Sequence, residues 1–313
     1  MNISKKSLDK VKISISEHII NTPILTNKEV NSICDSEVFF KCENFQKSGS
    51  FKFRAATNAI LNLNETDKKS GVITHSSGNF AQALALASKN QNITSHIVMP
   101  KNAPKFKKNA VIKTTDNLIE CKSTLEDREK TTTKIQNKYN LTFIHPSNNL
   151  DVILGNSTVV SELIQDHPDL DYILCPIGGG GLIAGSALAC KAHSNKCEII
   201  GVEPLNVNDA YKSLKSKKIE YNLKTDTIAD GLRTNLGDIN FPIILKHIKS
   251  IICVSEDEII NAMKLIYNKL NILIEPSSAV TFAGVLKEKE KFKGKKVGVI
   301  LSGGNVDSKK LPF

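Results

Sequence analysis

A single lysine is the first candidate for covalent chemistry in this chain. Lys52 lies between Phe51 and Phe53, directly after the segment 48–50 (Ser-Gly-Ser), where a helix is expected to begin. The helix dipole and the apolar neighbours both disfavour an ammonium group, so they lower the lysine pKa. The neutral amine that results is the nucleophilic form. On these residues alone, a surface lysine with a snorkelling side chain stays an open alternative.

Four consecutive glycines, Gly178 to Gly181, give the strongest binding signal. They follow the apolar run 172–177 and precede a helix-forming segment. Residues without Cβ let backbone N–H groups approach an anion, and the helix N-terminus adds partial positive charge. The segment 179–184 also reads G-x-G-x-x-A, with Glu203 at the end of the next expected strand, as in dinucleotide-binding loops. The loop therefore predicts a phosphorylated cofactor and leaves NAD open.

Two further loops place polar side chains after apolar strands. The segment 75–79 (His-Ser-Ser-Gly-Asn) stands between a strand and a helix, and the segment 301–305 (Leu-Ser-Gly-Gly-Asn) ends another strand. Their hydroxyls could face a ligand, but Ser77 or Asn79 could equally cap the helix that follows. Each loop is a weak signal when it is taken alone.

The elements that must position these residues alternate between strands and helices. Apolar runs predict strands at 38–42, 71–74, 95–99, 118–121, 142–144, 172–177, 198–202, 251–254 and 297–301. Amphipathic stretches predict helices at 78–89, 105–112, 125–139, 152–165, 181–193, 256–270 and 277–289. This alternation favours an α/β fold with two open parallel-sheet domains, each carrying helices on both faces. We expect a large domain from residues 1–70 and 148–313, and a small domain from 71–147.

Composition narrows the class of protein. The net charge is +10, but the lysines are scattered and aromatic residues make up only 5%, so a nucleic-acid partner is not expected. The chain has no long apolar stretch and no signal-peptide core at its start, which favours a cytoplasmic protein without membrane contact. The seven cysteines form no CxxC pair, and most are expected to be reduced, buried thiols.

Taken together, the motifs resemble those of the fold-type II pyridoxal-5′-phosphate (PLP) enzymes, in particular the serine racemase and serine/threonine dehydratase family, whose fold is like that of the tryptophan synthase β subunit. They occur in family order and span nearly the whole chain: FQKSGSFKFR (45–54), THSSGN (74–79), PIGGGGLIAG (176–185), EPLNVND (203–209), IADGL (228–232), LIEPSSA (273–279) and LSGGNVD (301–307). A set of long motifs in order is far more specific than any single loop, so NAD is no longer favoured.

The resemblance implies a role for each cofactor-side residue. Lys52 would carry PLP as a Schiff base, and Phe51 would pack against its ring. Asn79 would bond the 3′-hydroxyl, and Gly178, Gly179, Gly180 and Gly181 would hold the phosphate. Ser302 would face the pyridine nitrogen. A neutral hydroxyl there leaves that nitrogen unprotonated, which suits β-elimination.

The resemblance also implies substrate and metal residues. Ser76, Ser77 and Asn79 would bind the substrate carboxylate, Arg128 would stand on the substrate side, and Ser77 would return a proton to the face of Cα opposite Lys52 in a racemase. Glu203 and Asp209, with the Val207 carbonyl oxygen and water, match a divalent-cation site suited to Mg²⁺ or Ca²⁺.

The expected activity is conversion of a hydroxy amino acid such as L-serine or L-threonine to a 2-oxo acid and ammonia. The alternatives are a serine racemase with side lyase activity, a β-replacement enzyme and a non-catalytic binding protein. One departure from the family is Phe80, which stands where a histidine is usual beside the substrate. We therefore expect a pocket for a different or larger β-substituent than that of serine. The resemblance implies a homodimer.

Overall fold

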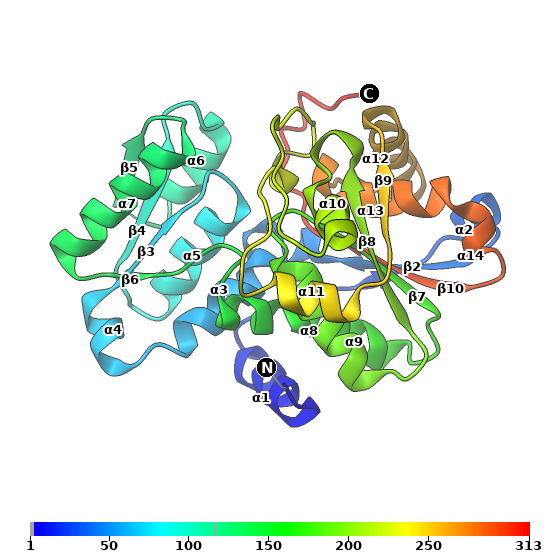
Figure 1. The fold of residues 1–313 in the computed structure, drawn as a ribbon, viewed down its shortest axis with the longest axis horizontal. Helices are drawn as coiled ribbons and strands as arrows, with labels where there is room; N and C mark the ends of the chain where they lie inside the picture. Colours follow the sequence, from blue (N-terminus) through cyan, green and yellow to red (C-terminus); the bar gives the residue numbers. More distant parts are fainter. Residues whose placement is uncertain (1–2, 116) are drawn as a thin grey trace.

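A computed structural model describes residues 3–115 and 117–313, apart from the side chain of Leu125. The chain forms two lobes, each built on its own β-sheet (Figure 1). The smaller lobe comes from one continuous segment, whereas both ends of the chain contribute to the larger lobe. No helix in this described part of the chain is long and apolar enough to cross a bilayer.

The smaller sheet has the strand order β5-β4-β3-β6, and all its pairs are parallel. Its strands are β3 (Val72–His75), β4 (Ser95–Pro100), β5 (Leu118–Cys121) and β6 (Thr142–Phe143). Successive side chains of a strand point to opposite faces. Val72 and Ile97 accordingly join one core cluster with α5 (Asn79–Asn90), while Ile73 and Val98 join another with α7 (Leu125–Tyr139). Helix α6 (Lys105–Ile112) packs beside α5.

The larger sheet has the order β1-β2-β10-β7-β8-β9. Its strands are β1 (Ile24–Leu25), β2 (Glu37–Cys42), β7 (Tyr172–Pro176), β8 (Glu198–Pro204), β9 (Ile251–Val254) and β10 (Lys296–Leu301). Helices α8 (Leu150–Asp166) and α9 (Gly181–His193) cover one face, and α12 (Glu256–Leu270) and α13 (Pro276–Lys287) cover the other. The prediction of a parallel sheet needs one addition, because the edge strand β1 pairs antiparallel with β2.

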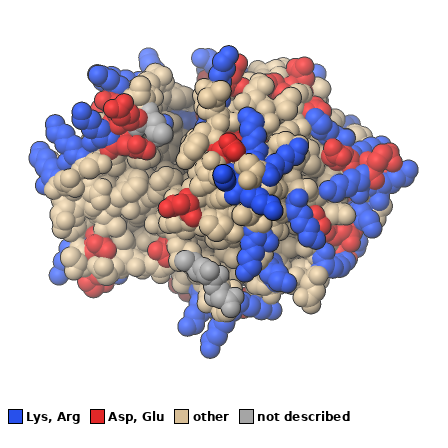
Figure 2. Space-filling model, in the orientation of Figure 1, with Lys and Arg blue, Asp and Glu red and all other residues tan. Residues whose placement is uncertain are grey.

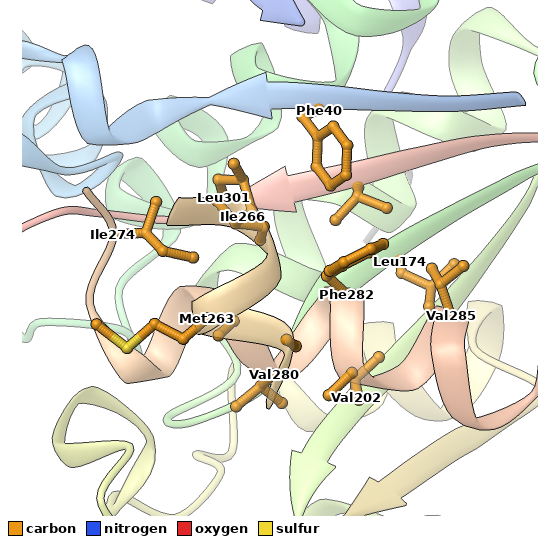
Figure 3. Packing of buried hydrophobic residues seen from close by; sticks show 14 of the residues in the cluster. Phe40, Leu174, Val202, Met263, Ile266, Ile274, Val280, Phe282, Val285 and Leu301 are labelled. Atoms are coloured by element: carbon orange, nitrogen blue, oxygen red, sulfur yellow. The ribbon is translucent and has the colours of Figure 1, made fainter. Parts of the chain in front are cut away.

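Apolar side chains from the larger sheet and from α12 and α13 form a continuous core (Figure 3). The rings of Phe40 on β2 and Phe282 on α13 meet edge to face, with centroids 5.2 Å apart. Leu174 and Val202, on β7 and β8, lie in the same cluster. Burial of each such side chain stabilises the fold by about 1.5–3 kcal/mol, so this core holds the ends of β7, β8 and β10 rigidly in place.

Helix α3 (Lys52–Leu61) connects the two lobes, because it packs on both α5 and α8. Its residues Phe53, Ala56 and Ile60 belong to the core cluster of the smaller sheet, together with Phe80 of α5. Part of the segment 1–70 therefore packs against the small lobe. We keep the boundaries 1–70, 71–147 and 148–313 as a proposal for how the chain divides.

Of α3, only the start at Lys52 was predicted. Six further helices of the described chain were not predicted. Their bounds are α1 (Lys5–Ile15), α2 (Lys28–Cys34), α4 (Glu65–Ser70), α10 (Asp209–Ser216), α11 (Phe241–His247) and α14 (Lys289–Phe292). Every predicted strand and each of the seven predicted helices is present, with ends that differ by a few residues.

Candidate active site

Lys52 is the first residue of α3, and its amine is enclosed between the two lobes. Its Nζ donates to the carbonyl oxygen of Pro146 at 2.8 Å and lies 5.0 Å from the ring centre of Phe51 and 5.7 Å from that of Phe80. Burial lowers the Lys52 pKa to about 8, although the negative charge of Glu275 opposes this shift. A large fraction of the lysine is therefore neutral near pH 8, as the flanking phenylalanines predicted.

The segment 145–148, which follows β6, brings Lys52 close to the glycine loop. Pro146 accepts from Lys52, and the next residue, Ser147, touches the loop. The ring nitrogen Nδ1 of His145 accepts from the backbone N–H groups of Ser147 and Asn148 at 3.1 and 2.8 Å. Burial, His75 and Lys52 lower the pKa of His145 to about 4, so the ring is a neutral acceptor that shapes this turn. The sequence motifs gave no sign of this segment.

The glycine loop leaves β7 and enters α9, whose first residue is Gly181. A Cβ at Gly181 would lie 2.8 Å from the carbonyl oxygen of Ser147, and Gly180 has a φ of +80°, which favours glycine. The Asn240 side chain donates to the Gly179 carbonyl oxygen at 2.8 Å and fixes the loop. Since the backbone N–H groups at the start of α9 are not used within the helix, the loop suits an anion such as a phosphate.

Ser302 directly follows β10 and lies beside the lysine segment. Its backbone carbonyl oxygen accepts from the N–H of Phe51 at 3.0 Å, and its hydroxyl oxygen is 3.1 Å from that of Ser278. The Ser278 hydroxyl also accepts from the N–H of Gly303 at 2.7 Å. The first contact holds Ser302 next to the lysine segment, and the hydroxyl of Ser302 has another hydroxyl group as its partner. The structure brings this predicted pair together, and it adds Ser278.

Asn79 begins α5, but neither it nor Ser77 caps that helix, because Gly78 is the N-cap and has no side chain. The amide of Asn79 instead donates to the two carboxylate oxygens of Glu275 at 2.8 and 3.1 Å. Asn305 in turn donates to the Asn79 side-chain oxygen at 3.0 Å. The structure thus joins the loops 74–79 and 301–305 through Asn79.

Glu275 is a site residue that our sequence reasoning missed, although it lies in the motif LIEPSSA. Its side chain is 3% exposed, and burial, assisted by Asp230, raises its pKa to about 7. Burial has the opposite effect on the neighbouring Lys52, because it lowers the pKa of the amine. The two shifts bring an acid and an amine to similar pKa values in one enclosed site, which is typical of proton-transfer chemistry.

Ser76 and Ser77 lie on the loop between β3 and α5, two to three residues before Asn79, and both are half-buried. The Ser76 hydroxyl accepts from the N–H of Gly78 at 3.3 Å, and its own N–H donates to Val98. The loop leads into the first turn of α5, whose backbone N–H groups are not used within the helix and can receive a carboxylate.

Arg128, on α7, lies near the carboxyl end of β3. The arginine charge contributes to lowering the pKa of His75, after burial, and it also acts on Cys121. The Nε atom of Arg128 is buried and has no hydrogen-bond partner among the described residues. A buried donor without a partner costs free energy, so this guanidinium suits an anionic group that is absent from the protein itself.

Glu203 and Asp209 come together away from Lys52, where β8 runs through a short turn into α10. Both carboxyl groups are fully buried. Glu203 accepts from the N–H groups of Ala210 and Tyr211 at 3.2 and 2.8 Å, so it does not face the glycine loop as a ribose-binding acid would. Burial raises the pKa of both carboxyl groups, that of Asp209 to about 6, and Asp209 contributes to the shift of Glu203.

A cation would relieve this pair of like charges. The Oδ2 atom of Asp209 is buried and has no hydrogen-bond partner in the described part of the chain. No group of three His, Cys, Asp or Glu side chains that could hold a metal occurs among the described residues. A cation there would thus need backbone and water oxygens besides the two carboxylates, and Val207 lies between them on the turn.

A buried cluster of four charged side chains holds α3 in place, and the sequence gave no sign of it. Its members are Lys41, Glu43, Arg54 and Glu162. The Arg54 guanidinium contacts Glu43 at 2.8 Å and Glu162 at 2.6 Å, and Lys41 contacts Glu162 at 2.7 Å. Lys41, Glu43 and Arg54 are fully buried. Arg54 follows Lys52 by two residues, so this cluster ties the lysine-bearing helix to β2 and α8.

The site thus combines a lysine of lowered pKa with a loop suited to an anion, between two α/β lobes, which is the arrangement expected of an enzyme with a phosphorylated cofactor. Comparison with known proteins gives the family: the model for pyridoxal-phosphate dependent enzymes matches residues 15–303, and the chain belongs to that family. The chain is 44% identical to a serine racemase of Dictyostelium discoideum, with 97% of this chain and 95% of the relative covered. It is 42% identical to a β-hydroxyaspartate dehydratase of Paracoccus denitrificans, over 96% and 95%.

Among solved structures, maize serine racemase superposes with a TM-score of 0.96 at 38% identity, over 99% of this chain and 95% of the maize chain. The predictions of the fold class, of a PLP-dependent enzyme and of its family are therefore confirmed. The relatives include both racemases and a dehydratase, which correspond to the activity expected from the sequence and to its first alternative.

Proposed function

We propose that this protein is an ammonia-lyase that converts a small β-hydroxy amino acid to a 2-oxo acid and ammonia. The observation that carries the proposal is the position of Lys52. Its amine has a lowered pKa and lies beside the glycine loop, next to Ser302 and within the reach of Glu275. The loop of Ser76 and Ser77 opens in front of α5 in the same lobe interface.

The residues present fit PLP. The glycine loop leaves no space for Cβ atoms and directs helix-start N–H groups at an anion, so Gly178 to Gly181 would hold the phosphate. Lys52 would carry the aldehyde carbon, Phe51 would contact the ring, Asn79 would face the 3′-hydroxyl and Ser302 the ring nitrogen. When bound, PLP supplies an electron sink that stabilises negative charge at the substrate Cα.

Lys52 is the base in this proposal. With a pKa of about 8, its Nζ can accept the Cα proton of the substrate near neutral pH. The Pro146 carbonyl oxygen restrains the amine without adding a negative charge that would raise its pKa. Phe51 and Phe80 exclude water from two sides of the amine. Glu275, with its raised pKa, could hold a proton beside Asn79.

The substrate carboxylate would be bound by Ser76, Ser77 and the helix-start N–H groups near Asn79. The unpaired Nε of Arg128 favours a second anionic group on the substrate, and the apolar Phe80 favours a β-substituent other than the bare hydroxymethyl group of serine. The relative from Paracoccus is named for β-hydroxyaspartate, whose second carboxylate is both an anionic group and an additional substituent on Cβ. We therefore place 3-hydroxyaspartate beside serine and threonine as candidate substrates.

Serine racemisation is the second candidate. Two of the similar proteins above are named serine racemases. In a racemase reaction, Ser77 would donate the proton to the face of Cα that Lys52 cannot reach. We further propose that Glu203, Asp209 and the Val207 carbonyl oxygen bind Mg²⁺ or Ca²⁺. A homodimer and a cytoplasmic location complete the proposal. The free cysteines of the described chain accord with a reducing compartment.

The test is a panel of L-serine, L-threonine and the 3-hydroxyaspartate isomers, scored for 2-oxo acid and, by chiral chromatography, for inverted amino acid. Release of a 2-oxo acid with ammonia from at least one of them is the expected result. Inverted serine without 2-oxo acid would replace the lyase by the racemase. Neither product from any substrate, with PLP added, would contradict the proposed function.

A further inference from the structure

An open pocket lies along the outer edge of the larger sheet, away from Lys52. Its volume is about 390 Å³, which lies in the range of small-molecule sites. Strand β9 is the last strand of the sheet and supplies one wall through residues 250–253. The turn before α10 supplies Leu205 and Asn208. The end of α13 and the start of α14 supply Lys287, Glu288 and Lys291.

The charge around this pocket favours an anion. Lys287 and Lys291 line it, and Glu288 is the only acidic residue among its lining residues. Figure 2 shows Lys and Arg side chains gathered over the face where Figure 1 places α10, α11 and β9, with few acidic residues between them. The sequence places lysines in or next to these three elements at 212, 215, 217, 218, 246 and 249. Such a field raises the local concentration of anions.

The walls also offer apolar surface and an unused hydroxyl group. Leu205 is 52% exposed, and the partly buried Tyr211 presents a ring beside it. Among the described residues, the buried Ser250 hydroxyl has no hydrogen-bond partner. The flat apolar body of a ligand would cover Leu205 and Tyr211, and its polar end would form a hydrogen bond with the hydroxyl of Ser250.

We propose that this pocket binds a small organic anion, with an aromatic or apolar body against Tyr211 and Leu205 and a carboxylate or phosphate group near Lys287 and Lys291. The ligand would contact Asn208, which stands between Val207 and Asp209. On the proposed function, that turn carries the cation ligands, so the pocket is suited to an effector that acts on the cation site. Binding itself does not depend on the reaction.

Two cysteines give a direct readout in the PLP-loaded enzyme. Cys253 lines the pocket and is half-buried, and Cys197 is half-buried but does not line it. Because the thiolate is the reactive form and burial raises the pKa of Cys253 to about 11, the alkylation is slow and is followed over hours with excess reagent. Phenyl phosphate at millimolar concentration should slow the alkylation of Cys253 further, while the rate at Cys197 should not change. Peptide mass spectrometry measures both rates in one sample, and the bound PLP keeps the probe out of the glycine loop.

A matched pair of double variants tests the lysines. Lys287 forms an ion pair with Glu258, and Lys291 lies over the ring of Tyr172. In Lys287→Ala/Lys291→Ala the probe concentration for half protection should rise about tenfold, as loss of two ionic contacts implies.

The control, Lys269→Ala/Lys138→Ala, removes the ion pair of Lys269 with Glu29 and the contact of Lys138 with Tyr139, both outside the pocket. It should leave protection unchanged.

Three probes distinguish the sources of binding. Phenyl phosphate, phenylacetate and the neutral phenylacetamide share a ring and differ in the charged group. Protection by either anion, or both, but not by the amide supports the proposal and identifies the favoured group. No protection of Cys253 by any of them, equal protection by the amide, or an equal loss in the control variant would overturn it. None of these measurements depends on turnover, so failure here leaves the proposed activity untouched.

Discussion

The amine of Lys52 and the carbonyl oxygen of Pro146 lie 2.8 Å apart, so an uncharged acceptor restrains the nucleophile. A carboxylate in that position would stabilise the ammonium form and raise the lysine pKa. The Pro146 carbonyl oxygen orients the Lys52 amine without raising its pKa in this way. The residue that carries it, Pro146, also precedes Ser147, which touches the glycine loop, so one short segment links Lys52, the proposed base, to the loop proposed for the phosphate.

Replacement of Arg54 by alanine should destabilise the protein by about 3–5 kcal/mol, because the buried Glu43 would lose its ionic partner and Glu162 would keep only Lys41. Urea unfolding followed by circular dichroism measures the loss. Lys68→Ala, which removes an exposed ion pair with Glu65, serves as the control and should unfold like the wild type. Equal stability of Arg54→Ala and wild type would contradict the account of this cluster.

Added Ca²⁺ or Mg²⁺ should raise the melting temperature, since a cation offsets the repulsion between Glu203 and Asp209 and satisfies the free Oδ2 atom. Asp209→Asn should remove most of this increase. The control variant Asp226→Asn changes a residue outside the Glu203/Asp209 pair and should keep the increase in melting temperature. A melting temperature that does not respond to either cation in the wild type would refute the metal site.

The raised pKa of Glu275 gives a stability difference that depends on pH. Between about 4.5 and about 7 the folded protein keeps a proton on Glu275 that the unfolded chain has lost, so ionisation opposes folding as the pH rises. Glu275→Gln avoids this cost and can still accept from Asn79. In unfolding experiments without added cofactor, the variant should gain up to about 3 kcal/mol relative to wild type across that window. A difference in unfolding free energy between variant and wild type that does not change with pH would contradict the raised pKa of Glu275.

Phe80→His should change the substrate preference, because it replaces an apolar ring near Lys52 with a polar one. We expect the ratio of kcat/KM for serine to that for 3-hydroxyaspartate to change by about tenfold, which corresponds to about 1.4 kcal/mol. Phe106→His, at a partly exposed phenylalanine on α6, should leave the ratio unaltered. If the ratio is the same in all three proteins, Phe80 does not select the substrate.

Much of the fold could be predicted because local pattern and tertiary structure agree. The strand at 172–177, the four glycines and the helix from Gly181 form one continuous signal, and the structure reproduces it. The two-residue strand β1 was missed, since it exists only through its pairing with β2. Short helices such as α10 and α11 have too few turns to show a period.

The site was predicted where motifs are contiguous and missed where contacts are distant in sequence. Lys41 and Arg54 look like surface charges in the sequence, yet both are fully buried, because Glu43 and Glu162 come to them from other elements. Pro146 has no polar side chain, and its role depends on a backbone oxygen, which no residue pattern reveals. Glu275 lay inside a quoted motif but was given no role.

The most direct test of the central claim is to reduce the PLP-loaded enzyme with borohydride and map the modified peptide by mass spectrometry. Our account predicts a pyridoxyl group on Lys52. In Lys52→Ala, it predicts loss of the visible absorption band of the bound cofactor and a fall in lyase activity of about 10²–10⁴-fold. A pyridoxyl group on another lysine, or a wild-type protein that binds no PLP, would contradict the account.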